Sequence, residues 1–466
     1  MEQKNSDVLV QNIVTAGKSH IEACLQEDIP VICINRETRK NKTMPFRALY
    51  DNDNQFWQKN ETWEFFLSHE DIKKIEEKVN KHNAKWAPAM RGVGSAMTDA
   101  QDNPLQNGFG DEYEKFSSMP EAERCQCVEA GKNRLNTLIT KKPKQKEVVT
   151  EALVETAQDT ILCNHISLLN ALNLSGDDAK KQTQHLVDST RDLVQASSQL
   201  ISANIFHDDL INTLVSKSNG TIIQHMTRVY LKGLAFLSCY NKLVSSSNII
   251  MKLRITFPQK YQAFYNALLP HFHPDDITLE KVFLGGMRAI PEHTFFNWAV
   301  GFLVHDVGKA AAVEYHEGEA SYNRDIVMDH VKVGYNSIVQ KTNYPPDAGL
   351  IAGYHHEYYG DAAGYGFFRT NLEQHKKANP QLRQDHCIAY EVEPMLKFEA
   401  LAFFPAKVLE IVDIFDSITD PNRKYRKPMT TEEALIMMKE EFINKHPKID
   451  YILFDLFEKF VTVKAS

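Results

Sequence analysis

Histidine and aspartate residues suited to metal binding recur in the second half of this sequence. The apolar run Phe295 to Val304 ends in the segment His305-Asp306-Val307-Gly308-Lys309. His330 follows, then the pair His355-His356, and Asp413 lies within a later apolar segment. Imidazole nitrogens and carboxylate oxygens suit divalent ions such as Mn, Fe and Zn, and the two oxygens of one carboxylate can bridge two ions. The set predicts a two-metal site that hydrolyses phosphate esters.

The elements that would carry these side chains are helices with apolar periodicity. His225 lies in one that begins near Thr221, where a lone histidine is more often a core residue than a ligand. Adjacent histidines on a helix diverge by about 100°, so His355 and His356 face one site only at a helix end or a bend. Lys309 follows Asp306 by about one turn and would reach a bound phosphate, unless it is simply a solvated helix end.

Composition limits the class of protein. The chain has 466 residues, of which 43% are hydrophobic and 24% charged, as in a soluble globular protein of two or three domains. Its net charge of -8 argues against binding of a nucleic acid polymer or an anionic membrane. The 7 cysteines include no CxxC spacing, which favours reduced thiols. With polar first residues and no apolar stretch near the roughly 18 residues of a membrane span, we expect a cytoplasmic protein.

The expected fold is mainly α. Residues 1–85 are expected to form a small α/β regulatory or docking domain, with strands at Ile29–Ile34 and Trp63–Leu67 and a capping box at Ser68 and Asp71. Residues 86–120 are expected to be a linker, 121–205 a helical connector, and 206–466 an all-helical catalytic domain of HD type. His207-Asp208-Asp209 repeats the HD letters without the flanking pattern and is interpreted as a polar turn or helix start.

Over about residues 206–460 the sequence resembles the HD-GYP family of HD phosphohydrolases, which hydrolyse cyclic di-GMP. The segments that carry the resemblance are His225-Met226-Thr227-Arg228-Val229, His305-Asp306-Val307-Gly308-Lys309, His330, His355-His356-Glu357, Gly364-Tyr365, Asp413-Ile414-Phe415-Asp416, and the basic segment Arg423-Lys424-Tyr425-Arg426-Lys427. Gly366 stands where the family has proline, and Thr221 where members with a third metal carry glutamate. The sequence therefore favours two metal ions.

The resemblance implies a role for each matching residue. One ion would be bound by His225, His305, Asp306 and Asp413, and the other by His330, His355 and His356, with Asp306 bridging. Lys309, Tyr365, Arg423 and Arg426 would contact substrate phosphates or bases. Because His225 lies far before His305 in the sequence, His273 remains a rival first ligand. Asp306 and Lys309 would be the catalytic residues.

The function implied by this resemblance is hydrolysis of cyclic di-GMP to pGpG, and onward to GMP, by a hydroxide that bridges two divalent ions. Fe or Mn is favoured, with Zn, Ni and Mg as alternatives. Two other functions stay open: an HD phosphohydrolase that acts on another cyclic dinucleotide or nucleotide, and a non-catalytic cyclic-dinucleotide sensor that signals through residues 1–205. A homodimer through the connector or the first domain is a further expectation.

Overall fold

The structure is a computed structural model, and it describes residues 8–9, 24, 29–35, 38, 40–47, 63–68, 71, 74, 110–141, 146–172, 174–202, 221–246, 248–309, 324–359, 376, 378–420 and 428–462. The chain divides into two compact units. Unit 1 comprises Met1–Met90 with Lys439–Lys445, and unit 2 comprises Arg91–Met438 with His446–Ser466. None of the described helices is long and apolar enough to cross a membrane.

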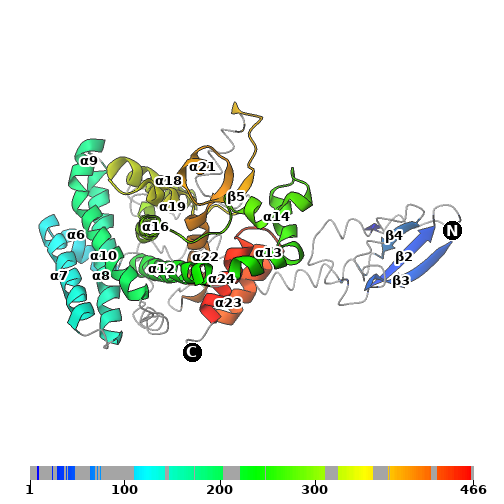
Figure 1. Ribbon diagram of the computed structural model, residues 1–466, viewed down its shortest axis with the longest axis horizontal. Helices are drawn as coiled ribbons and strands as arrows, with labels where there is room; N and C mark the ends of the chain where they lie inside the picture. Colours follow the sequence, from blue (N-terminus) through cyan, green and yellow to red (C-terminus); the bar gives the residue numbers. More distant parts are fainter. Residues whose placement is uncertain are drawn as a thin grey trace. The chain divides into compact units, whose positions relative to one another are not determined.

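Unit 1 contains a four-stranded antiparallel sheet with the strand order β1-β4-β2-β3 (Figure 1). Its strands are β1 (Val8–Leu9), β2 (Pro30–Asn35), β3 (Asn41–Pro45) and β4 (Trp63–Leu67). The side chains of Val31 and Cys33 alternate along β2 with more exposed neighbours and are fully buried, so one face of the sheet covers a core. Ser68 Oγ accepts the backbone N–H of Asp71 at 3.2 Å, which is the hydrogen bond expected of the predicted capping box.

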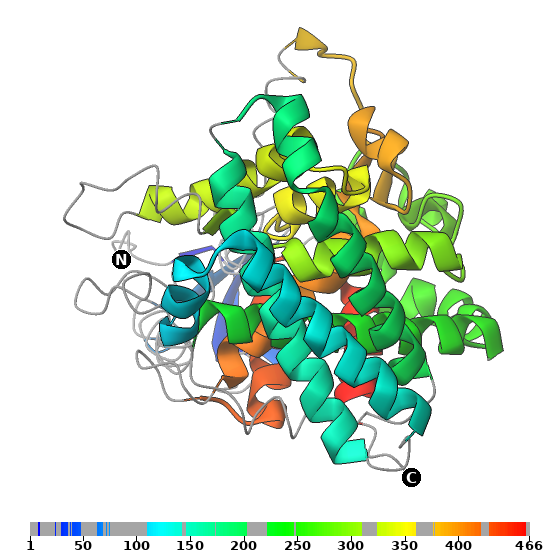
Figure 2. The same ribbon diagram turned by 90° about the vertical axis from the view of Figure 1, so that its left-hand side faces the viewer.

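Unit 2 is mainly α, as the sequence predicts (Figures 1 and 2). Its first helices are α6 (Gly110–Ser118), α7 (Glu121–Lys141), α8 (Lys146–Ala171), α9 (Gly176–Gln182) and α10 (Gln184–Ser202). The middle of the unit contains α12 (Ile222–Ser246), α13 (Ile249–Lys260), α14 (Gln262–Leu268), η1 (Pro274–Asp276), α15 (Leu279–Val282), α16 (Glu292–Val304), α18 (Arg324–Lys341) and α19 (Pro346–Tyr354).

The remaining elements of unit 2 are β5 (His386–Ala389), α21 (Val392–Leu396), β6 (Ala400–Phe403), α22 (Phe404–Thr419), α23 (Thr431–Lys439) and α24 (Tyr451–Thr462). The π-helical turn η2 (Glu440–Asn444), between α23 and α24 in the sequence, belongs to unit 1. Strands β5 and β6 pair in parallel. Helix α6 lies within the stretch 86–120 that the sequence suggests is a linker. It forms because Phe116 is buried where α6 packs on α8.

Four helices form the core that supports the predicted metal-ligating residues. Helix α16 packs against α12 and α19, and α22 packs against the same two helices. From Trp298 to Val304 every residue of α16 is buried, as expected for a helix that is apolar on all sides. Helices α8 and α10 pack in turn on α12 and α16, so the predicted connector and the predicted catalytic domain pack together within unit 2.

Candidate metal centre

The seven predicted metal ligands lie together in unit 2, although five helices supply them. His225 lies in the first turn of α12, His330 in α18 and Asp413 in α22. His305 and Asp306 follow the end of α16, and His355 and His356 follow the end of α19. All seven side chains are buried. Ligand atoms of Asp306, His330, His355 and His356 lie within 4.8 Å of one another, and so do those of His225, His305 and Asp413.

Asp306 lies between the two groups, and each of its carboxylate oxygens faces a different pair of histidines. Its Oδ2 lies 3.4 Å from His305 Nε2 and 3.8 Å from His225 Nε2. Its Oδ1 lies 3.1 Å from His330 Nε2 and 3.5 Å from His355 Nε2. A carboxylate with this arrangement can bridge two ions that lie about 3.5–4 Å apart.

Asp413 also faces both groups. Its Oδ1 lies 2.9 Å from His225 Nε2, and its Oδ2 lies 3.9 Å from His356 Nε2. The side chains around them keep both aspartates ionised. Burial alone would raise the pKa of Asp306, but Lys309 and His305 hold it well below its usual range. His225 and His356 likewise lower the pKa of Asp413 against the effect of burial.

Backbone hydrogen bonds fix the orientation of two histidines. The Nδ1–H of His305 donates to the carbonyl of Phe302 at 2.9 Å, and that of His355 donates to the carbonyl of Ala352 at 2.9 Å. Because a carbonyl only accepts, the proton of a neutral ring lies on Nδ1 and the Nε2 lone pair faces the centre. Within the described ranges, these two Nε2 atoms are buried without a hydrogen bond. A metal ion would satisfy them, so the residues present fit a metal-bound state.

The ends of α16 and α19 make the neighbouring ligands converge. His355 is the C-cap of α19, with φ -68° and ψ -6°, and the helix does not continue through His356. The two imidazole rings consequently lie 4.1 Å apart between centroids, with planes inclined at 44°. Burial lowers the pKa of both rings, that of His356 well below its usual value, so both are neutral and able to bind a metal at neutral pH.

Asp416, one turn beyond Asp413 on α22, orients His225. Its Oδ2 accepts the Nδ1–H of His225 at 2.9 Å. Arg228 and Lys232 of α12 donate to the same carboxylate, Lys232 at 2.7 Å. Despite burial, these two cations hold the pKa of Asp416 well below its usual range. The sequence places Asp416 in the segment Asp413-Ile414-Phe415-Asp416 but does not indicate its role. The signal for that role is its spacing of three residues from Asp413, which puts both carboxylates on the same face of a buried helix.

Some predicted residues are placed elsewhere or lie outside the described residues. His273 has a side chain that is 69% exposed and contacts Asp275, so His225 and not His273 is present in the cluster. Thr221 caps α12, because its Oγ1 accepts the backbone N–H of Gln224 at 3.3 Å. Tyr365, Arg423, Arg426 and the segment His207-Asp208-Asp209 lie outside the described residues.

Lys309 is not a solvated helix end. Its ammonium group forms an ion pair with Asp306 Oδ2, and its side chain is only 15% exposed. The structure adds a residue that the sequence does not reveal: His165 of α8 lies beside Asp306, and burial lowers its pKa to about 4. His165 is therefore neutral at neutral pH, and it is a point at which the predicted connector reaches the candidate metal centre.

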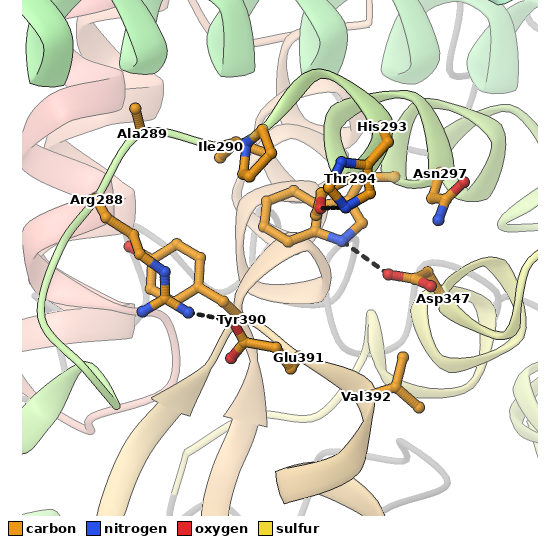
Figure 3. A pocket seen from close by; sticks show the side chains of 12 residues that line it. Arg288, Ala289, Ile290, His293, Thr294, Asn297, Asp347, Tyr390, Glu391 and Val392 are labelled. Carbon is orange, nitrogen blue, oxygen red and sulfur yellow. Dashed lines mark hydrogen bonds and ion pairs between the residues drawn. The ribbon is translucent and has the colours of Figure 1, made fainter.

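A separate cavity of about 340 Å³ lies between the start of α16 and the start of α19, and none of the predicted site residues lines it (Figure 3). Within it, the indole N–H of Trp298 donates to Asp347 Oδ1 at 3.1 Å. Arg288 forms an ion pair with Glu391 and lies over the ring of Tyr390 at 4.3 Å. The Trp298–Asp347 bond joins α16 to α19, whose opposite ends carry His305 and His355.

Comparison with known proteins adds little to this geometry. No family model and no curated protein matches the sequence. Among solved structures, the chain is similar to that of Bd1817, an HDG"Y"P protein from Bdellovibrio bacteriovorus. The two have 9% sequence identity over 98% of this chain and 99% of that chain, with a TM-score of 0.33.

Proposed function

We propose that this protein is a metal-dependent phosphodiesterase of HD type that hydrolyses cyclic di-GMP to linear pGpG, which a second hydrolysis would convert to GMP. The observation that carries the proposal is the pair of ligand groups that meet at Asp306. One ion would be held by His225, His305, Asp306 and Asp413, and the other by Asp306, His330, His355 and His356. Fe and Mn suit this set of nitrogen and oxygen ligands.

The charge of the centre supports a phosphate ester as the substrate. Its histidines are neutral when they bind metal, so only Asp306 and Asp413 contribute negative charge. Two divalent ions would therefore leave an excess of positive charge in a buried site, although the whole chain has a net charge of -8. When bound, such ions activate water at neutral pH and hold phosphate oxygens during in-line displacement.

The protein's own residues would position the substrate and balance its charge. The ammonium group of Lys309 contacts Asp306 Oδ2, the oxygen that faces His305 and would bind an ion. Because a divalent ion and an ammonium group compete for that oxygen, Lys309 would turn towards the phosphate and offset its developing charge. Asp416 would keep the proton of His225 on Nδ1 and so aim Nε2 at the ion. Tyr365, Arg423 and Arg426 are proposed to contact phosphates or bases.

The test is a double variant in which His305→Ala and Asp306→Ala remove ligands on both sides of the centre. We expect the purified variant to contain neither ion and to release no pGpG from cyclic di-GMP in the presence of added Mn or Fe. Metal content is measured by plasma mass spectrometry and the products by chromatography. His273→Ala is the matched control, because this exposed histidine lies outside the cluster and its loss should change neither quantity. Full turnover by the double variant would exclude the mechanism.

A substrate panel tests the finer part of the proposal. Gly366 in place of the family's proline removes a stiff residue from the segment Gly364-Tyr365-Gly366. Other cyclic dinucleotides should therefore be tested beside cyclic di-GMP. Faster hydrolysis of another cyclic dinucleotide would reassign the substrate and keep the reaction. Tight binding of cyclic di-GMP without product, in metal-replete protein, would identify a sensor instead of an enzyme.

A further inference from the structure

Two thiols and an imidazole from three different helices meet in the connector, away from the histidine–aspartate centre. They are Cys125 of α7, Cys163 of α8 and His185 of α10, and their ligand atoms all lie within 4.8 Å of one another. The three helices pack on one another and lie side by side in Figures 1 and 2. Cys163 is buried, and the other two side chains are half-buried.

The imidazole of His185 belongs to this cluster and has a buried nitrogen. Within the described part of the chain, its Nε2 has no hydrogen bond. Glu121 Oε1 lies 3.5 Å from that nitrogen. Glu121 precedes Cys125 by four residues on α7, so the two side chains project from the same face of the helix. A carboxylate is thus available beside the Cys125 sulfur and the His185 nitrogen.

We propose that the connector binds a zinc ion through Cys125, Cys163 and His185, with Glu121 as the fourth ligand. Thiolate and imidazole ligands in tetrahedral geometry are the set that zinc prefers. With Zn–S bonds of about 2.3 Å and Zn–N bonds of about 2.0 Å, ligand atoms around one ion lie roughly 3.5–3.8 Å apart. The ligand atoms of Cys125, Cys163 and His185 need only small side-chain movements to reach that spacing, and the partly exposed Glu121 side chain would turn in to complete the set. This site has sulfur ligands, which the histidine–aspartate centre lacks.

The surroundings of the cluster suit an ion. Cys163 is buried, and a divalent ion would deprotonate both coordinating thiols. The Arg124 guanidinium lies close to both sulfurs and would offset the charge that the thiolates and Glu121 bring to one ion.

A zinc ion in this position would join the connector to the proposed active site. Cys163 and His165 lie two residues apart on α8 and therefore point to opposite sides of that helix. The Cys163 side contacts α7 and α10, while His165 lies beside Asp306. By fixing α8 between α7 and α10, the ion would hold the segment that carries His165 against the turn that carries Asp306.

The experiment uses cobalt as a spectroscopic probe in the full-length protein. We expect zinc-depleted wild type loaded with Co²⁺ to show the near-ultraviolet charge-transfer band of cobalt–thiolate bonds, which the sulfur-free histidine–aspartate centre cannot produce. Cys163→Ser should abolish or strongly reduce the band. The matched control is Cys127→Ser on the same helix, outside the cluster, which should leave the band unchanged.

A second variant and two further measurements keep the proposal testable if Cys163→Ser does not fold. His185→Gln replaces a half-buried side chain and should weaken Zn²⁺ binding by at least about tenfold in a competition assay with a chromogenic chelator. As-purified wild type should contain one zinc equivalent more than a Cys125→Ser variant. A wild type without the cobalt band, or an intact mass lower by two hydrogens that shows a Cys125–Cys163 disulfide, would overturn the proposal.

Discussion

Replacing Gly308 with alanine is expected to disrupt the metal centre without removing any ligand. Gly308 lies two residues after Asp306, where the chain passes against α18. A Cβ at this position would lie 2.0 Å from the carbonyl oxygen of His330 and 2.5 Å from the backbone nitrogen of Gly334. Both are backbone atoms of α18 and cannot rotate away, so the helix itself must move. The contact explains why this position of the His-Asp segment requires glycine.

The size of the displacement follows from these distances. A carbon and an oxygen in contact lie about 3.3 Å apart, so α18 must retreat by roughly 1.3 Å from the added methyl group. His330 moves with the helix. In the unsubstituted protein its Nε2 lies 3.1 Å from Asp306 Oδ1, close enough for one ion to bind both atoms. Because metal–nitrogen bonds are only about 2.0–2.1 Å long, the displaced ring would no longer reach an ion bound to Asp306. A misplacement of about 1 Å costs roughly a hundredfold in rate.

We therefore expect Gly308→Ala to lose the ion bound by His330, His355 and His356 and at least about a hundredfold in cyclic di-GMP turnover. Metal content and product chromatography measure the two effects. Gly334→Ala is the matched control on the other side of the contact, where an added Cβ would lie 3.4 Å from Gly308 N, an ordinary contact. Wild-type metal content and turnover in Gly308→Ala, or equal damage from Gly334→Ala, would refute the reasoning.

Two further predictions concern buried carboxylates. Asp416→Asn should weaken binding of the ion proposed at His225 by about 10–100-fold, because Asp416 accepts the Nδ1–H of that histidine. Asp420→Asn removes another partner of Arg228 and should leave metal affinity unchanged. Calorimetric titration of metal into metal-free protein compares the two variants. Burial raises the pKa of Glu410 to about 8, so the folded state favours the protonated carboxyl. Metal-free wild type should then lose stability as pH rises from about 4.3 towards 8, by at most about 1.4 kcal/mol per pH unit, and Glu410→Gln should remove this slope in urea titrations. Parallel slopes for wild type and variant would contradict that assignment.

Much of the local structure could be predicted from the sequence, because it depends on neighbouring residues. The strand Trp63–Leu67 has the predicted bounds, and the strand predicted at Ile29–Ile34 begins and ends one residue later, as β2. The apolar run before His305 is a buried helix, and the pair His355-His356 lies at a helix end. The predicted domain boundaries and the roles of Tyr365, Arg423 and Arg426 stay predictions.

The sequence by itself determined which residue types were present and in what order: histidines and aspartates within helices or directly after them. Only the tertiary structure decided that His225 and not His273 joins the cluster, and that the two oxygens of Asp306 face different pairs of histidines. It also brought Cys125, Cys163 and His185 together, although no short spacing links them. The physical reason is that helix packing, and not separation along the chain, sets the distances between side chains on different helices.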